Sequence, residues 1–497
     1  MGTPQVSYGS VASRSETTKG KRSRSLGQQD LHEDIWCHIH SLLPIRDSAR
    51  AASVSRTFLR SWRYRPNLIL SEETLGLEQI ACGEGDIARA LTDKIDQILK
   101  NHSRTGVKTL ELDIFGCRDL DTCYLDNWLQ VAITPAIEKL TLSLPSKCQE
   151  GYSFPCSLLF GQNGGSIQYL HLTRCAFHPT VGIGCFRNLT ELYLGYVRIT
   201  GQELGCLLSN SLALMQLELK YCSEIICLKI PCMLEQLSSL TVSDCSMLQM
   251  IESQAPNLTT FDFEGDNLVQ LSLQQSLQVN DVDMQCSEEN FLCYAITKLP
   301  YMLPNLESLT LSSSSERVNT PMAPAKFLHL EYLEIYFDGD PSPGYDYLSL
   351  LSFLDASPVL ETFVLRVHQF NLKFDSIFES ASHLRQMPEH KHGNLKDFSI
   401  FGFCSAKSMV ELTCHIIESA TSLECITLDS VFDQEDDDDL GRCCLTSARK
   451  TGACWPLSDE MMLEAHKGLK AIERYIVGKI PSTVKLDVRR PCSQCHP

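Results

Sequence analysis

The chain has 497 residues, of which 43% are apolar and 21% charged, and its 61 acidic and 43 basic side chains give a formal net charge of −18. This apolar fraction is typical of a globular protein, and the acidic balance repels phosphate backbones, which argues against broad nucleic-acid binding. No run of about 18 apolar residues occurs, so the sequence predicts no membrane span.

The 23 cysteines are scattered and form no short, regularly spaced framework. The N-terminal residues, MGTPQVSYGS, lack the apolar segment of a secretory signal. We therefore expect free thiols in a reducing compartment, the nucleus or the cytoplasm or both. Residues 1–29 are rich in Ser, Thr, Gly, Lys and Arg and predict a disordered basic tail. Its KGKRSRS stretch fits a nuclear-localisation patch and a generic basic tail equally well.

A dense helical pattern follows in residues 30–62, DLHEDIWCHIHSLLPIRDSARAASVSRTFLRSW. One apolar stripe runs from Leu31 to Leu43, and Pro44 should end that first helix. A second helix should have Asp47 in its first turn, and a third should begin at Ser55. The apolar residues that we expect on these two helices are Ala49, Ala52 and Val54, then Phe58, Leu59 and Trp62. About forty residues cannot bury so many apolar groups by themselves, so this face must pack on the solenoid described next, on another protein, or on both.

Downstream, residues 86–100 show helical spacing and predict a linker helix. A recurring hxxhxh pattern, where h is Leu, Ile, Val, Phe or Met, then occurs thirteen times, starting at residues 107, 137, 167, 189, 214, 237, 258, 279, 306, 330, 360, 395 and 423. The mean step of about 26 residues falls within the range of leucine-rich repeats. The fourth and sixth positions alternate, which predicts a short strand in each unit, stacked on its neighbours into one continuous core. The unit VNDVDM at 279 is the weakest match, and steps of about 21 to about 35 residues predict an irregular solenoid.

Several units place Cys or Gly directly after the strand, as in LHLTRC, LELKYC, LTVSDC and LDIFGC. This resembles the position of the leucine-rich-repeat consensus at which a small or polar group helps the chain turn. Side chains that flank the buried strand positions should point out of the concave face, where acidic groups outnumber basic ones and aromatic groups are interspersed. The predicted target-binding residues are His171, Tyr193, Glu218, Lys220, Asp262, Glu334, Tyr336 and Arg366, with Glu111, Asp113, Glu264 and Asp429 on the same face.

Catalytic motifs are missing or incomplete. His32 and Glu33 begin like HExxH, but position 36 is Trp, and no Walker A loop or GxSxG elbow occurs. The GEGDIA stretch at 83–88 follows no clear strand. The EHKH and CSQCH stretches each lack a nearby partner pair for a tetrahedral zinc site. A site completed by Cys443, Cys444 and Cys454 stays an alternative only if the fold brings these residues together. We predict no catalytic residues, no metal and no cofactor.

The helical block at 30–62 resembles an F-box, whose usual form in plants runs LPxDhhxxIhSxLPhRDAxRAAxVSRxWxxxW. Matches include Asp34, Ser41, Arg46 and Arg56, whereas His32 stands where the family usually has Pro, and Phe58 where it often has Trp. Residues 393–430, GNLKDFSIFGFCSAKSMVELTCHIIESATSLECITLDS, resemble the FBD segment that ends many plant F-box/leucine-rich-repeat proteins, and the last residues are similar to the tails of grass members of that group. DQEDDDD at 433–439 should be a solvated loop.

The resemblance implies an α/β chain with a small N-terminal helical F-box and an irregular leucine-rich-repeat solenoid, its parallel strands on the concave face. The expected organisation is a tail at 1–29, the F-box at 30–70, a linker at 71–106, the solenoid at 107–392 and final repeats with the FBD-like segment at 393–497. The implied adaptor-binding residues are Leu31, Ile35, Ile39, Leu43, Pro44 and Val54.

The implied function is that of the non-catalytic substrate-recognition subunit of an SCF-type ubiquitin ligase. Its expected partners are a Skp-family adaptor, through it a cullin, and an unknown target protein, with neither nucleic acid nor membrane. The alternative is a leucine-rich-repeat scaffold without ligase activity, which the His32 departure favours.

Overall fold

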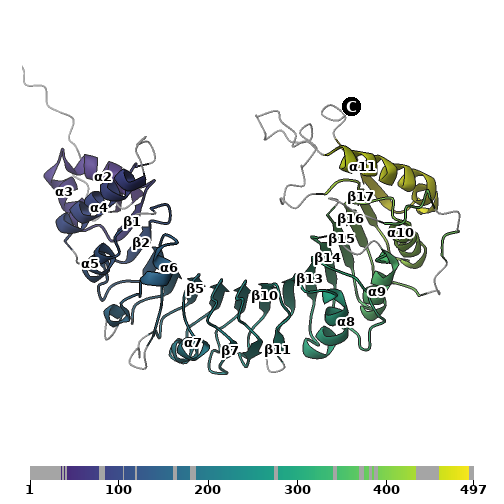
Figure 1. Cartoon of the computed structure of the whole chain (residues 1–497), viewed down its shortest axis with the longest axis horizontal. Coiled ribbons are helices and arrows are strands. Elements are labelled where there is room, and N and C mark those ends of the chain that lie inside the picture. Colours follow the sequence, from purple (N-terminus) through teal and green to yellow (C-terminus); the bar gives the residue numbers. More distant parts are fainter. Residues whose placement is uncertain are drawn as a thin grey trace, which may run out of the picture.

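The computed structural model describes residues 35, 38, 39, 42–77, 84–103, 106–117, 120–159, 165–179, 186–273, 278–339, 344–368, 374–379, 383–385, 390–432 and 458–491. Within them the chain forms an arc whose inner side is one large parallel sheet and whose outer side carries most of the helices (Figure 1). Leu31, His32, the segment 1–29, the DQEDDDD stretch and the CSQCH motif lie outside the described residues.

The large sheet has fifteen strands in the described part of the chain, each parallel to its neighbours. In order they are β1 (Asn67–Ser71), β2 (Thr109–Asp113), β3 (Lys139–Ser143), β4 (Tyr169–Thr173), β5 (Glu191–Gly195), β6 (Gln216–Lys220), β8 (Ser239–Ser243), β10 (Thr260–Gly265), β12 (Asp281–Cys286), β13 (Ser308–Ser313), β14 (Tyr332–Phe337), β15 (Thr362–Val367), β16 (Asp397–Phe401), β17 (Cys425–Asp429) and β18 (Lys485–Arg489).

Every one of the thirteen predicted units is a strand of this sheet, including VNDVDM, which forms β12. In β6, Leu217 and Leu219 are buried between the neighbouring strands, and Leu214 three positions earlier is buried with them. Each buried leucine contributes about 1.5–3 kcal/mol of transfer free energy. The same positions repeat in register along the sheet, so one hydrophobic core runs from Ile45 to Ile476.

The segments that lead from one strand of the large sheet to the next, here called returns, differ along the arc. Behind β6, β8 and β10 they form a second parallel sheet that the leucine pattern did not predict, of β7 (Cys227–Ile230), β9 (Met250–Ser253) and β11 (Gln270–Ser272). Elsewhere the returns include α4 (Glu84–Asn101), α5 (Cys123–Ala132), α6 (Cys148–Gly151), α7 (Gly201–Leu208), α8 (Phe291–Met302), α9 (Leu351–Ala356), α10 (Lys407–Ser419) and α11 (Asp459–Ala471), with short turns η1 (Cys156–Leu159), η2 (Tyr347–Leu350), η3 (Ile472–Ile476) and η4 (Val477–Lys479).

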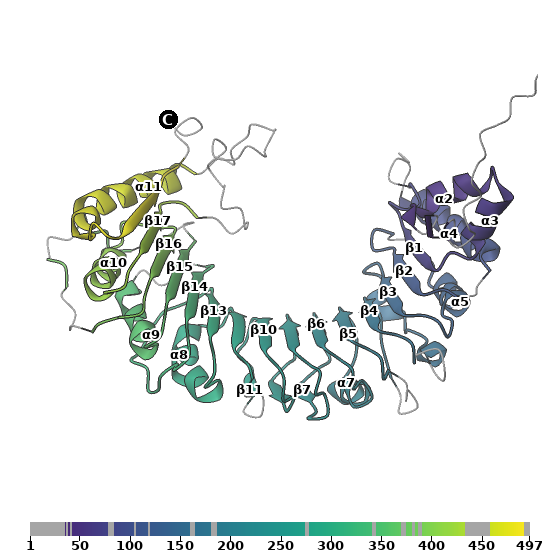
Figure 2. The ribbon, with the colours of Figure 1, turned by 180° about the vertical axis from the view of Figure 1, so that it is seen from behind.

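This difference explains the curvature. A helix is about 10 Å across, whereas neighbouring strands lie only about 4.8 Å apart, so helices on the outer side widen it relative to the sheet. The strand-backed middle around β7 and β11 is the flattest part of the arc, and the helix-backed parts turn inward (Figure 2).

At the N-terminal end, α2 (Ile45–Ala52) and α3 (Arg56–Arg63) precede β1. Asp47 lies in the first turn of α2 as predicted, but α2 ends before Val54, which lies in the following turn. Ser55 occupies the N-cap of α3 without a side-chain hydrogen bond. The sheet begins at β1, inside the segment predicted as F-box, and the linker helix predicted at 86–100 is α4. In the described residues no helix has the length and apolar character to cross a membrane.

Candidate functional site

The N-terminal helical block, residues 35–63, leaves apolar side chains on its surface. Leu42, which was not among the predicted adaptor-binding residues, is 72% exposed. Of the predicted residues, Ile35, Ile39 and Val54 are 45%, 36% and 79% exposed. Of the other predicted adaptor-binding residues, Pro44 is exposed, Leu43 is half-buried and Leu31 lies outside the described residues. Isolated exposed apolar residues are ordinary, but four of them within one short block form a surface of the kind at which proteins interact.

The opposite side of the block is anchored to the solenoid. Ile45, Ala52 and Trp62 are buried, and the Arg65 guanidinium donates to the Ser48 hydroxyl at 2.9 Å and to the Leu43 carbonyl at 2.6 Å. Burial lowers the pKa of Arg65. Since Arg65 also bonds the Asn67 carbonyl at the start of β1, the block is held to the sheet while its outer side stays open.

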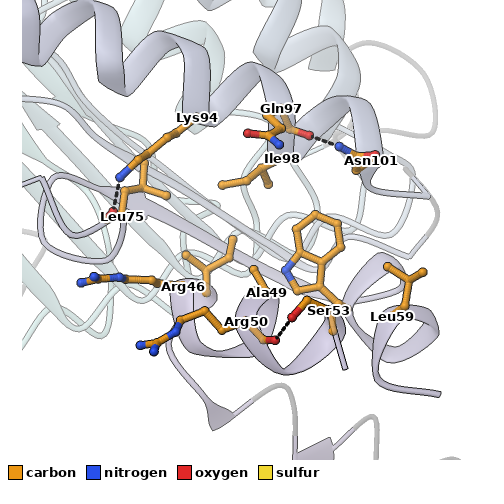
Figure 3. Close-up of a pocket in the computed structure, with 13 residues that line it drawn as sticks. Arg46, Ala49, Arg50, Ser53, Leu59, Leu75, Lys94, Gln97, Ile98 and Asn101 are labelled. Carbon is orange, nitrogen blue, oxygen red and sulfur yellow. Dashed lines mark hydrogen bonds between the residues drawn. The ribbon is translucent and has the colours of Figure 1, made fainter. Parts of the chain in front are cut away.

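Between α2, α3 and α4 lies a cleft of about 590 Å³ (Figure 3). Its walls are apolar at Leu59, Leu75 and Ile98, and its rim carries Arg46 and Arg50 of α2 opposite Lys94 of α4, a basic spot on an acidic protein. Lys94 donates to the Leu75 carbonyl at 2.7 Å, and its pKa is lowered by partial burial and by the charge of Arg46. The cleft can accept an apolar group that carries a negative charge.

The predicted target-binding residues form two groups on the inner side of the arc, with Asp262 between them. On β4 to β6, the His171 and Tyr193 rings stack 3.9 Å apart, and Tyr193 is in register with Glu218, which pairs with Lys220 at 2.8 Å. Burial lowers the pKa of His171. The two rings of this group are therefore in contact with each other, and its two charged side chains pair with each other.

The second group lies on β14 and β15. Glu334 pairs with Arg366, whose guanidinium also lies 4.7 Å from the centre of the Phe401 ring and 5.4 Å from that of Phe432. Tyr336 meets Phe432 edge to face at 5.5 Å. A half-buried cation among aromatic rings can contribute through stacking to recognition of a protein surface.

Between these groups the face is acidic. Asp262 accepts a hydrogen bond from the Thr241 hydroxyl at 2.9 Å, yet burial raises its pKa. The neighbouring Asp283, which sequence analysis missed because it lies in the weakest repeat, has its pKa raised to about 6 by desolvation and then by Asp262 and Glu334. The centre of the concave face therefore favours a cationic ligand.

One predicted residue on this face is not available. Asp429 was expected to point out of β17, but it is only 1% exposed. Its carboxylate accepts the Val431 N–H at 3.0 Å, because the chain turns back over the strand end. Asp429 is thus part of a turn and offers nothing to a partner.

The residues considered for metal binding do not form a described site. His390 and His392 of the EHKH stretch each lie 3.8 Å from Asp355. In the part of the chain that the structure describes, no three His, Cys, Asp or Glu side chains are grouped as metal ligands.

The cysteines that follow the strands in LELKYC and LTVSDC pack inward. The Cys222 thiol lies 3.4 Å from the Leu194 carbonyl, and the Cys245 thiol lies 3.9 Å from the Leu219 carbonyl.

A further set of surface residues escaped the sequence analysis. Arg174, Tyr196, Tyr221 and Asp244 each come directly after a strand. Aligning the repeats on their strands places these four in one column, next to the cysteine position that the sequence analysis did identify.

Comparison with known proteins fits this architecture. The model of the At1g61320/AtMIF1 leucine-rich-repeat domain matches residues 98–493. The F-box/LRR-repeat protein At5g02910 of Arabidopsis thaliana is 23% identical over 293 residues, which are 57% of this chain and 59% of that protein, less than two thirds of its length.

Two solved structures from Listeria monocytogenes are also similar. The functional domain of InlJ, described as including a cysteine ladder, is 12% identical over 65% of this chain and 60% of that one, with a TM-score of 0.27. The internalin InlF is 13% identical over 69% of this chain and 82% of that one, with a TM-score of 0.29. Since the family model covers well over half of the chain, this protein belongs to the At1g61320/AtMIF1-type leucine-rich-repeat family.

Proposed function

We propose that this chain is the substrate-recognition subunit of an SCF-type ubiquitin ligase. In this proposal the helical block binds a Skp-family adaptor, and the concave face captures the protein to be modified. The receptor performs no chemistry itself and contributes proximity and orientation to a separate conjugating enzyme.

The observation that carries the proposal is the set of exposed apolar side chains on the block. Ile35, Ile39, Leu42 and Val54 stay open while the other side of the block is anchored through Ile45, Trp62 and Arg65. The similarity of residues 30–62 to an F-box supports it, as does a relative that is itself an F-box/LRR-repeat protein. The FBD-like segment at 393–430 would then complete the target-binding end of the solenoid.

Co-purification with a Skp-family adaptor tests this function. The full chain should retain the adaptor, and Val54→Asp should weaken retention by about tenfold or more because it places a charge in an apolar contact. Leu212→Asp, at an exposed leucine outside the block, is the matched control and should leave retention unchanged. Failure of the wild-type chain to retain the adaptor would exclude the ligase role.

The second candidate function is an interaction scaffold without ligase activity, which is favoured by His32 standing where the F-box family usually has Pro. Replacing His32 by Pro separates the two functions. If the natural block binds adaptor, His32→Pro should change the affinity little. A gain of about a hundredfold, from an undetectable starting level, would instead favour the scaffold.

A further inference from the structure

The column of side chains that directly follows β4, β5, β6 and β8 is held by an unusual backbone. Arg174, Tyr196, Tyr221 and Asp244 all have φ between 52° and 55°, the left-handed region. This conformation is unfavourable for a residue other than glycine. The N–H of each residue donates to a carbonyl of the next strand of the sheet, for example Tyr196 to Lys220 at 2.7 Å. The repeated conformation aims four side chains along one edge of the sheet.

These side chains form one continuous stack. The Tyr196 and Tyr221 rings lie 4.3 Å apart and 7° from parallel. The Arg174 guanidinium lies 4.7 Å from the centre of the Tyr196 ring and 4.2 Å from that of Phe115. At the other end, a hydrogen bond to the Asp244 carboxylate raises the pKa of the Tyr221 hydroxyl. We call Phe115, Arg174, Tyr196, Tyr221 and Asp244 the rim row.

Two hollows meet at Tyr196 in the middle of the rim row. The first, of about 540 Å³, lies between the β1 end and Tyr196 and is lined by three carboxylates, those of Glu72, Glu73 and Asp113. The second, of about 350 Å³, lies on the β10 side and is also lined by three carboxylates, those of Asp244, Glu264 and Asp266. Phe115 and Tyr221 are themselves exposed, so the row presents aromatic surface between two acidic hollows.

The two hollows beside the rim row are predominantly acidic. Among the described residues, none of the six carboxylates forms an ion pair, and the basic side chain that lines a hollow, Arg174, is held between Phe115 and Tyr196. Aromatic faces attract guanidinium and ammonium groups, and nearby carboxylates add to that attraction. Anionic ligands, including nucleic acid, would be repelled.

We propose that the rim row binds an extended, arginine-containing segment of a partner protein, with one cationic side chain in each hollow and the backbone crossing the tyrosine pair. The hollows centre near β3 and β8, four strand steps apart in the sheet. At about 4.8 Å per step the separation is about 19 Å, which about six extended residues span. Arginine fits better than lysine because its planar group stacks on rings while it pairs with carboxylates. The inference rests on the proposed function only in taking a protein as the target, and it requires no adaptor.

Fluorescence anisotropy with the full chain tests the proposal. The probe is a labelled Gly/Ser peptide with two arginines about six residues apart, and matched peptides carry glutamine or glutamate in their place. The arginine peptide should bind saturably and more weakly at high salt, and the other two should not bind. The double variant Asp244→Asn, Asp266→Asn and the single variant Tyr221→Ala should each weaken binding by about tenfold. Asparagine suits position 244 because it tolerates the left-handed backbone.

The control is Glu235→Gln with Glu424→Gln, which removes the same charge from two exposed carboxylates outside the rim row and should leave binding unchanged. No binding of the arginine peptide up to millimolar concentration, or equal binding by all variants, would overturn the proposal. Adaptor retention by the same proteins separates the two hypotheses. A wild-type chain that retains adaptor but does not bind the arginine peptide overturns only the rim-row proposal, and a wild-type chain that binds the peptide but retains no adaptor overturns only the ligase role.

Discussion

The helical block exposes several apolar side chains, whereas the solenoid buries the leucines of its strands. In the solenoid, each strand buries its leucines between two neighbouring strands, as Leu240 of β8 is buried between β6 and β10. In the block, Leu42 and Val54 are exposed to solvent, although Trp62 of the same block is buried. A stacked repeat completes its own core, whereas the short helical block leaves apolar side chains that neither it nor the solenoid buries. The exposed apolar side chains of the block are therefore the surface for which we propose adaptor binding.

The largest expected contrast comes from shortening one leucine in each region. Leu240→Ala should lower the free energy of unfolding by about 2–5 kcal/mol because it leaves a cavity in a packed core. Leu42→Ala should change it by less than about 0.5 kcal/mol, since an exposed side chain loses little. Urea unfolding of both variants measures the difference. Similar losses for the two would mean that the block is packed as tightly as the solenoid.

Within the solenoid, charged groups should show a smaller contrast between a buried and an exposed ion pair. Arg385 donates to the buried Glu411 carboxylate at 2.7 Å and to Asp346 at 2.6 Å. Arg385→Ala should lower the free energy of unfolding by about 2–3 kcal/mol, because the buried Glu411 carboxylate then keeps only the backbone N–H of residue 385 at 2.8 Å and Lys407 at 3.9 Å. Arg317→Ala breaks only an exposed pair with Glu289, and a loss below about 1 kcal/mol is expected there. Equal effects in thermal unfolding would contradict this account of the solenoid.

Removing one negative charge from the acidic centre of the concave face should stabilise the fold. The pKa of Asp283 is raised from 3.8 to about 6, so its favourable contribution is complete below pH 3.8 and is lost as the pH rises through about 6. Asp283→Asn should therefore raise the free energy of unfolding at pH 7 by up to about 1 kcal/mol, limited by solvent screening, and should change it little near pH 4. Glu235→Gln, at an exposed carboxylate, is the control. A loss of stability at pH 7 would be inconsistent with repulsion at this site.

A smaller pH effect is expected where the block joins the solenoid. His102, at the end of α4, is buried and lies 2.8 Å from the Arg65 carbonyl, and burial lowers its pKa from the ordinary 6.5. The unfolded chain then takes up the proton more readily, so stability should fall as the pH drops below 6.5. His102→Gln should reduce that slope between pH 7.5 and pH 5.5. An unchanged slope would assign the acid sensitivity to other groups.

The repeat pattern predicted thirteen of the fifteen strands of the inner sheet, because alternating leucines indicate a strand that is buried on one face. β1 and β18, at the two ends of the sheet, lie outside the thirteen predicted units. The pattern did not predict β7, β9 and β11, whose three or four residues are too few to show an alternation. Asp429 was misplaced because its burial depends on a turn at Val431, which the strand pattern does not contain. The rim row could have been found by comparing the repeats with one another, since Arg174, Tyr196, Tyr221 and Asp244 are of three residue types but share one position.

Amide hydrogen exchange with and without a Skp-family adaptor tests the central claim most directly. If the block is completed by a partner, exchange in residues 35–63 should slow when adaptor is added, while β10 to β14 of the solenoid should exchange as in the chain alone. Unchanged exchange in residues 35–63 at an excess of adaptor would contradict the claim that this block is an adaptor-binding surface.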